Sequence, residues 1–190
     1  MKFKKTNISN LIICEPTVFG DSRGYFMESF KQDDFSAFFG HAINFIQDNE
    51  SMSSYGVLRG MHYQRGMDAQ SKLVRVVQGK VLDVVVDLRK DSPTFQEVFR
   101  IELSATNKKQ LFVPKGCAHG YVVLSDTAIF QYKVDAPYKP SSECGFLYND
   151  KTLHIDWEVP PSEIITSEKD KKASDFKNAP VFLNSSNLYV

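Results

Sequence analysis

The sequence contains 190 residues, 42% of them hydrophobic and 24% charged, a mixture typical of one folded domain with a sizeable core. Lysine plus arginine and aspartate plus glutamate each number 23, so the formal net charge is zero. This balance excludes the broad positive field that nonspecific nucleic-acid binding requires, so a few local cations would have to bind any anionic ligand. We therefore expect a ligand pocket and no nucleic-acid partner.

The arrangement of apolar residues and cysteines predicts one cytoplasmic domain. The three cysteines are odd in number and far apart, which disfavours a disulfide framework or a thiolate zinc site. The apolar run at residues 11–14 is too short for the core of a signal peptide, and no run approaches the roughly 20 apolar residues that span a bilayer. We expect a single domain over residues 1–190 with no membrane partner, its core at about 8–170 and a surface tail at 171–190.

Short apolar or alternating runs with turn residues between them predict about eight β-strands, and hence a sandwich or barrel. Residues 20–24 indicate a tight turn. The connection at residues 78–80 has the length of a hairpin loop, which predicts antiparallel pairing of the two valine-rich strands beside it. The expected strands are residues 11–15, 25–30, 72–77, 81–88, 99–103, 110–113, 120–124 and 128–134.

Two short helices complete the predicted elements. Asp33 can cap the first, which would place the three phenylalanines of residues 35–39 on one face before Gly40 ends it. The second begins at Ser167, which has capping-box spacing to Asp170. Helices are therefore a minor part of the predicted fold.

Asp83 is a charged residue within an apolar strand. It shares a face with Val81, Val85 and Asp87, because side chains alternate along a strand. A buried carboxylate without a partner is costly, so an interior Asp83 should hold a cation, accept several hydrogen bonds or be neutral. A position facing solvent or at a barrel mouth is the alternative. Tyr132 poses a similar choice between an acid and an amphipathic core residue.

His62 and His119 lie in glycine-containing segments beside predicted strands. The ordinary pKa of histidine lies near neutrality, which suits proton abstraction without a large environmental shift. Each histidine taken alone could equally be a hydrogen-bonded structural imidazole. We therefore treat both as candidate functional residues.

Three long motifs, GVLRGMHYQ at residues 56–64, KLVRV at 72–76 and VPKGCAHG at 113–120, resemble the dTDP-4-dehydrorhamnose 3,5-epimerase family. The resemblance begins with FGDSRG at residues 19–24 and ends with SEKD at 167–170, so it covers most of the chain. It implies an all-β, cupin-type jelly roll and a homodimer. It also implies inversion of two sugar carbons beside a ketone, with no metal or organic cofactor, in a pathway that supplies L-rhamnose to cell-surface polysaccharides such as O-antigen.

The residues themselves also argue against a metal site. Metal-binding cupins usually supply two closely spaced histidines and a carboxylate from one motif, and one more histidine from another. This chain offers only His62 and His119 for those positions. Two ligands out of four do not make a convincing site, so we expect no bound metal.

The resemblance implies a role for each of three side chains. His62 would be the base, Tyr132 the acid on the opposite face, and Lys72 the cation near the ketone oxygen. A carboxylate on the other ring nitrogen of His62 would fix its tautomer. The resemblance points to Asp170 for this role, whereas the strand argument points to Asp83, and capping gives Asp170 a structural alternative.

The resemblance also implies a set of substrate-binding residues. Arg23 and Arg59 would bind the diphosphate, since guanidinium groups suit phosphate oxygens. Surface placement or plain packing is the alternative for such residues. The remaining implied positions are Phe19, Glu28, Gln47, Asn49 and Tyr138 around the base and linker, and His119, Glu143 and Lys169 near the substrate.

The segment at residues 65–68, RGMD, departs from the proline-containing loop common in the family. Related cupins act on other nucleotide sugars, invert one carbon only, or move the ketone between two carbons. An enzyme of that restricted kind is therefore one alternative. A sugar-binding cupin without catalysis is a second, because each candidate side chain could also bind a ligand.

Overall fold

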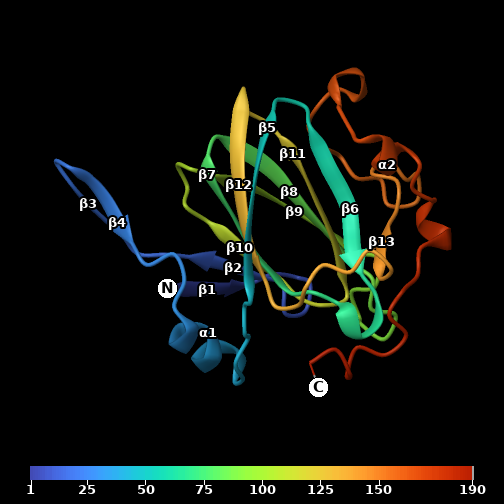
Figure 1. Cartoon of the computed structure of the whole chain (residues 1–190), viewed down its shortest axis with the longest axis horizontal. Coiled ribbons are helices and arrows are strands. Elements are labelled where there is room, and N and C mark those ends of the chain that lie inside the picture. The colour runs from blue at the N-terminus through green and yellow to red at the C-terminus, as the bar shows by residue number, and fades with distance from the viewer. Residues whose placement is uncertain (190) are drawn as a thin grey trace.

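The computed structural model describes residues 1–189 and consists of two antiparallel sheets and a projecting hairpin (Figure 1). Two α-helices and three 3₁₀ turns lie at the periphery. The strands are β1 (Lys2–Lys5), β2 (Ile12–Glu15), β3 (Val18–Asp21), β4 (Gly24–Met27), β5 (Gln47–Ser54), β6 (Leu58–Gln64), β7 (Lys72–Gln78), β8 (Lys80–Asp87), β9 (Val98–Ser104), β10 (Gln110–Val113), β11 (Cys117–Val123), β12 (Thr127–Val134) and β13 (Glu143–Gly145). The helical elements are α1 (Gln32–Phe39), η1 (Gly66–Asp68), η2 (Pro161–Glu163), α2 (Glu168–Lys171) and η3 (Phe176–Asn178).

The two sheets form a jelly-roll sandwich of the cupin type. One sheet has six strands in the order β1-β2-β10-β7-β12-β5, and the other has five in the order β13-β6-β11-β8-β9. An apolar cluster with members from both sheets, including Val74, Val85 and Phe130, fills the space between them. The predicted all-β fold class is confirmed.

Both sheets are also covered on their outer faces. Phenylalanines of α1 pack against Leu73 and Phe112 on the outside of the six-stranded sheet. The chain after β13 covers the five-stranded sheet, where Trp157, Phe176 and Phe182 are buried. The predicted surface tail therefore contributes to a core. Burial on both faces explains why β8 reads as a continuous apolar run and not as an alternating one.

The predicted hairpin at residues 78–80 is wrong. Strands β7 and β8 lie in different sheets: β7 pairs with β10 and β12, whereas β8 pairs with β11 and β9. Gly79, at φ 75°, lets the chain cross from one sheet to the other, and a Cβ there would lie 2.0 Å from the carbonyl oxygen of Thr127. The crossing turns the apolar faces of both strands toward the shared core.

The other predicted turns and caps were largely correct. Residues 20–24 form the turn of the β3–β4 hairpin, and Gly40 ends α1 in the left-handed conformation at φ 76°. The prediction that Asp33 caps α1 is wrong, since Lys31 occupies that position and Asp33 lies within the first turn of the helix. Ser167 does cap α2, and its Oγ accepts a hydrogen bond of 3.1 Å from the backbone N–H of Asp170.

Within residues 1–189, no helix is long and apolar enough to cross a membrane.

Candidate active site

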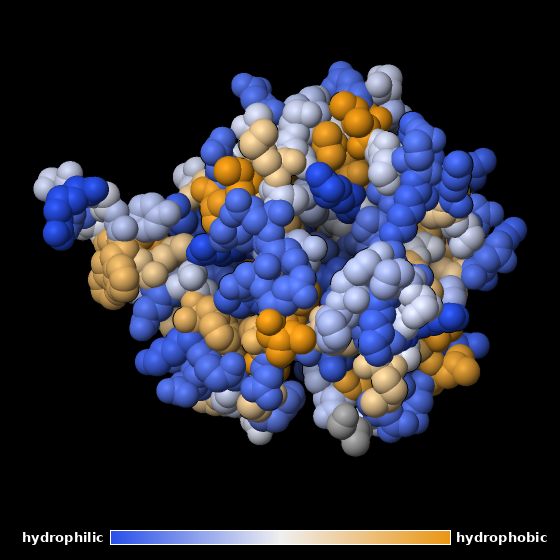
Figure 2. All heavy atoms as spheres, in the orientation of Figure 1, coloured by the Kyte–Doolittle hydropathy of each residue, from blue (hydrophilic) through white to orange (hydrophobic). Residues whose placement is uncertain are grey.

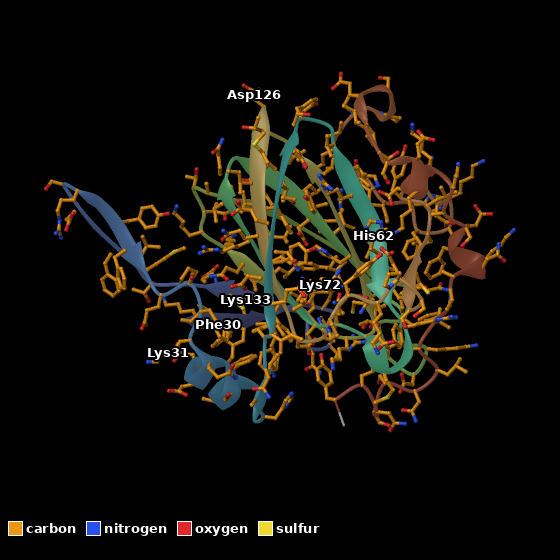
Figure 3. The ribbon with its side chains drawn as sticks, viewed as in Figure 1. Phe30, Lys31, His62, Lys72, Asp126 and Lys133 are labelled. Atoms are coloured by element: carbon orange, nitrogen blue, oxygen red, sulfur yellow. The ribbon has the colours of Figure 1, made fainter. Side chains whose placement is uncertain are left out.

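A cavity of about 500 Å³ opens between the two sheets and brings together the chemically interesting side chains of both. A neighbouring hollow of about 320 Å³ shares His62, Lys72 and Tyr132 with it, so the two form one continuous groove. Figure 3 shows His62 and Lys72 between the sheets, whereas Phe30 and Lys133 lie toward α1. The larger cavity is also lined by Arg59, His119, Tyr121, Lys169 and Asp170, and the hollow by Gln47, Asn49, Tyr138 and Glu143.

The His62 imidazole is held by Asp170. Nε2 of His62 lies 2.6 Å from Oδ1 of Asp170, a contact between β6 and α2 across 108 residues of sequence. Burial disfavours charge on Asp170, but hydrogen bonds from His62 and Ser167 outweigh burial and hold the pKa of this carboxyl below its usual range. A carboxylate on Nε2 favours the tautomer with its proton on Nε2, which leaves Nδ1 as the nitrogen able to accept a proton.

Asp83 does not contact His62. Its two carboxylate oxygens lie 3.0 and 2.9 Å from Nε2 of His119. Strand order explains the difference, because β8 pairs with β11, which carries His119, and β11 stands between β8 and β6. The expectation that Asp83 might hold His62 is therefore wrong, and Asp170 occupies that position. Burial raises the pKa of Asp83, and His119 and Lys72 oppose the rise.

Tyr132 and Lys72 come from the sheet opposite His62. In the β7–β12 register, Tyr132 lies opposite Val74, and Val134 lies opposite Lys72. Tyr132 and Lys72 are therefore diagonal neighbours on the same face of the sheet. Burial, with a smaller effect of Tyr121, raises the pKa of the Tyr132 phenol. Burial lowers the pKa of Lys72 to about 8, although Asp83 and Glu143 oppose this change. The phenol is therefore protonated at neutral pH, and the amine lies near its titration point.

A polar network surrounds the smaller hollow. Tyr138 donates a hydrogen bond of 2.6 Å to Glu143, which also forms an ion pair with Lys169. On β5, the amide of Gln47 donates to Asn49 at 2.7 Å. In the lining of the larger cavity, Arg59 donates to Ser53 Oγ at 3.2 Å. Arg59 thus supplies a guanidinium group to the groove, and the other residues of this network supply hydrogen-bonding groups.

Three predicted site residues lie away from this groove. Phe19 and Arg23 belong to the projecting β3–β4 hairpin, and Glu28 is an exposed residue just after it. The Phe19 residue is 62% exposed, and the Arg23 guanidinium is paired with Asp21 of the same hairpin. The structure of one chain therefore does not bring these three residues to His62.

Tyr121 is a cavity residue that the sequence reasoning missed. Its ring stacks on Phe130 at a centroid distance of 4.1 Å, and its hydroxyl lies 2.9 Å from Ser51 Oγ. The signal was present, because residues two apart in a strand share a face and Tyr121 follows His119 by two. Residues 165–167 also line the cavity, but their position depends on backbone bonds to Gly56 and Leu58 that sequence alone does not indicate.

Metal-binding side chains do not cluster in the described part of the chain. Within residues 1–189, no group of three or more histidine, cysteine, aspartate or glutamate side chains is arranged to hold a metal ion. In the groove, His62 and His119 each pair with a carboxylate through Nε2. The residues present thus form imidazole–carboxylate pairs.

The arrangement contains the parts needed to move protons on a bound ligand. An imidazole held by a carboxylate and a phenol come from opposite sheets, and an amine lies beside the phenol. A jelly roll with such a groove defines a class of protein that transfers protons to and from a small molecule.

Comparison with known proteins identifies the family. The sequence profile of the dTDP-4-dehydrorhamnose 3,5-epimerase family matches residues 5–178. A curated enzyme of that name from Escherichia coli K12 is 50% identical over 172 residues, which cover 90% of this chain and 92% of the relative. This chain belongs to the dTDP-4-dehydrorhamnose 3,5-epimerase family.

Solved structures agree with this assignment. A dTDP-4-dehydrorhamnose 3,5-epimerase from Elizabethkingia anophelis NUHP1 is 51% identical with a TM-score of 0.90, and the match covers 93% of this chain and 97% of the other. A dTDP-6-deoxy-D-glucose-3,5-epimerase from Legionella pneumophila Philadelphia 1 is 41% identical with a TM-score of 0.92. That match covers 97% of this chain and 99% of the other, and the Legionella enzyme was solved with dTDP-4-keto-L-rhamnose.

Proposed function

We propose that this protein is a dTDP-4-dehydrorhamnose 3,5-epimerase, which converts dTDP-4-dehydro-6-deoxy-D-glucose to dTDP-4-dehydro-L-rhamnose. The observation that carries the proposal is the placement of His62 and Tyr132 on opposite sheets around one groove. Inversion of a carbon requires removal of a proton from one face and delivery of a proton to the other. Family membership and the relatives' activities support the choice of substrate.

In this mechanism the substrate ketone at C4 acidifies the hydrogens on C3 and C5. Nδ1 of His62 takes a proton as the C–H bond breaks, and the electron pair moves into an enolate whose oxygen faces the ammonium of Lys72. Asp170 stabilises the imidazolium that forms. Tyr132 then gives its hydroxyl proton to the opposite face of the same carbon, and exchange with water restores both groups before the second carbon reacts.

The groove formed by the two cavities would hold the nucleotide portion of the substrate beside the sugar. Arg59 supplies a fixed cation for the diphosphate, and Gln47, Asn49 and Tyr138 supply polar and aromatic contacts for the thymidine. The ion pair of Glu143 and Lys169 joins the lining of the smaller hollow to that of the larger cavity. Binding energy from the nucleotide would thereby orient the sugar between the two reacting side chains.

We also propose that the protein works as a homodimer in which each chain, acting as one domain, completes the groove of its partner. The β3–β4 hairpin projects from the body in Figure 1, and Figure 2 shows hydrophobic atoms along it and a hydrophilic tip. Phe19, Tyr25 and Phe26 are 62%, 58% and 66% exposed, an unusual amount of aromatic surface for a free hairpin. A second chain would cover this surface and receive Phe19, Arg23 and Glu28.

Incubation with dTDP-4-dehydro-6-deoxy-D-glucose in deuterated water, followed by NMR, tests the function. We expect deuterium at both C3 and C5 together with inversion at both carbons. Incorporation at one carbon would instead establish a restricted epimerase. A shifted ketone would establish a ketoisomerase, and no exchange despite binding would establish a sugar-binding cupin. The proposed step would belong to a cytoplasmic route that supplies L-rhamnose for cell-surface polysaccharides.

A further inference from the structure

The groove contains a second imidazole–carboxylate pair that the proposed mechanism does not use. Asp83 has no exposed surface and His119 is 7% exposed. Both oxygens of Asp83 lie within hydrogen-bond distance of the same His119 nitrogen, at 3.0 and 2.9 Å. A buried carboxylate inside the apolar run at residues 81–86 costs stability unless it is paired, so the presence of Asp83 in β8 calls for a specific role.

This second pair lies directly beside the first. His119 on β11 is the cross-strand partner of His62 on β6, and side chains opposite one another in antiparallel strands are about 5 Å apart at Cβ. The carboxylates reach the two imidazoles from different elements, Asp170 from α2 and Asp83 from β8. The cavity wall therefore carries two imidazoles that are each held through Nε2.

We infer that Asp83 is a positioning residue that fixes the His119 ring, with Nδ1 available to the ligand. A neutral imidazole has one N–H, and the carboxylate draws it to Nε2, so Nδ1 becomes an acceptor. Among residues 1–189, the His119 ring forms its hydrogen bonds through Nε2 and none through Nδ1. His119 itself lines the larger cavity. The catalytic meaning of this arrangement rests on the proposed function.

The charge of Asp83 also acts on Lys72. Burial lowers the pKa of Lys72 to about 8, and Asp83 and Glu143 are the two carboxylates that oppose this change. Asp170 faces the same cavity but holds His62. The other titratable side chains around the groove are Glu50 on β5, Arg59, His62 and Tyr63 on β6, His119 and Tyr121 on β11, Tyr132 on β12, Tyr138 and Glu143 around β13, and Lys169 on α2.

An NMR titration of Lys72 tests the effect on the ammonium. Protein labelled with ¹³C-lysine is titrated in the wild type and in Asp83→Asn, and the Lys72 signal is assigned by its loss in Lys72→Gln. We expect the midpoint to fall by about one pH unit in Asp83→Asn, because asparagine keeps the shape of aspartate and removes its charge. The matched control is Asp170→Asn, which should shift the midpoint by less than about a third of that amount. An unchanged midpoint in Asp83→Asn, or equal shifts in both variants, would overturn the inference.

A second measurement needs no variant at position 83. Chemical shifts of ¹⁵N-histidine in the wild type report which nitrogen of His119 carries the proton, and we expect Nε2 to be protonated and Nδ1 bare in the neutral ring. The opposite tautomer would contradict the role assigned to Asp83. Neither titration depends on turnover, so both test Asp83 even if deuterium exchange rejects the proposed epimerase. In an active enzyme, Asp83→Asn should also move the alkaline limb of kcat/KM down by about one pH unit.

Discussion

In the proposed inversion, His62 accepts a proton and Tyr132 donates one, because the two side chains offer different atoms. The hydrogen bond of 2.6 Å to Asp170 leaves Nδ1 of His62 as the free acceptor. Burial raises the pKa of the Tyr132 phenol, so this group keeps its proton at neutral pH and can serve as the donor. Their different protonation states suit them to opposite faces of one ring.

Replacement of the base should therefore stop proton abstraction. We expect His62→Ala to lower turnover by about 10² to 10⁴, the usual effect of losing a positioned acid or base. His41→Ala is the matched control, because His41 is an exposed histidine that is not part of the groove lining and should leave turnover unchanged. Near-normal turnover in a folded His62→Ala protein, with its thermal midpoint retained, would reject the assignment.

Removal of the acid should separate exchange from inversion. In Tyr132→Phe, His62 can still take a proton, exchange it with solvent and return it to the same face. We expect inversion to fall by about 10² or more while deuterium still enters with retained configuration. NMR of the sugar in deuterated water distinguishes the two products. Normal inversion in this variant would show that another group delivers the proton.

The pH dependence should reflect Lys72. Its pKa is lowered from the usual 10.5 to about 8, so the ammonium is present below that value and is lost as pH rises through it. If the ammonium stabilises the enolate, kcat/KM should fall by about tenfold per unit well above pH 8. A pH–rate profile that stays flat to pH 10 would contradict this role.

The strands differ in how far the sequence predicts them. Strands β8 and β10 were predicted nearly to the residue, because each is a compact apolar run. Strand β5 was missed because its sequence, QDNESMSS, is polar on both faces, as suits a strand at the edge of a sheet. The β7–β8 connection was also predicted incorrectly, because the length of a loop does not determine which sheet the next strand joins.

The candidate site follows the same pattern. Motif resemblance located His62, Lys72, Tyr132 and Asp170, all of which line the groove. The partner of Asp83 depended on the order β6-β11-β8 within the sheet, which is a property of the folded arrangement. Contacts between distant segments are therefore the part that local sequence patterns do not specify.

The end of β8 carries a buried ion pair that should matter for stability. Asp87 accepts hydrogen bonds of 2.8 and 2.9 Å from the Arg89 side chain, and Arg89 also donates to the carbonyl oxygen of Ser9. Both charged residues are buried. Burial disfavours the charge on Asp87, but hydrogen bonds from Arg89, Ser92 and Thr94 outweigh burial and hold its pKa below the ordinary value.

Breaking this pair should destabilise the whole sandwich. We expect Asp87→Ala to lower the free energy of unfolding at pH 7 by about 3–5 kcal/mol, because it leaves the Arg89 charge buried and unpaired. Asp156→Ala, which removes an exposed partner of Arg100, should lower the free energy of unfolding far less, because solvent screens that pair. Urea unfolding curves measure both values.

The Asp87–Arg89 pair also predicts the direction in which the free energy of unfolding changes with pH. Because the folded pKa of Asp87 is lowered, its contribution is complete above the unfolded value of about 3.9 and is lost as pH falls through the folded pKa. The difference between wild type and Asp87→Ala should therefore shrink in acid. A difference that grows as pH falls would contradict the ion-pair explanation.

At the scale of the whole molecule, the projecting hairpin sets the expected assembly. Phe19 and Arg23 stand away from the groove of their own chain, and aromatic surface on the hairpin remains uncovered. A dimer that exchanges hairpins would bring these residues to the partner's groove and would cover the exposed aromatic surface. Each groove would then combine His62 of one chain with Arg23 of the other.

A mixing experiment tests this arrangement. We expect Arg23→Ala and His62→Ala to be weakly active alone and to recover about a quarter of wild-type activity when exchanged in equal amounts, since half the dimers are mixed and each has one intact groove. Two Arg23→Ala preparations mixed together are the control. Lack of recovery despite verified subunit exchange would reject a shared groove, and sedimentation as a monomer would reject the dimer.

The bond between His62 and Asp170 joins two parts of the chain that leave the ribosome at very different times. The imidazole, the phenol and the amine are all synthesised before the carboxylate that orients the base. Residues 165–170, which help to line the larger cavity, are also made late, so the reactive tautomer of His62 is secured only when α2 docks against β6. We therefore expect the site to become able to transfer protons only after most of the chain has been synthesised.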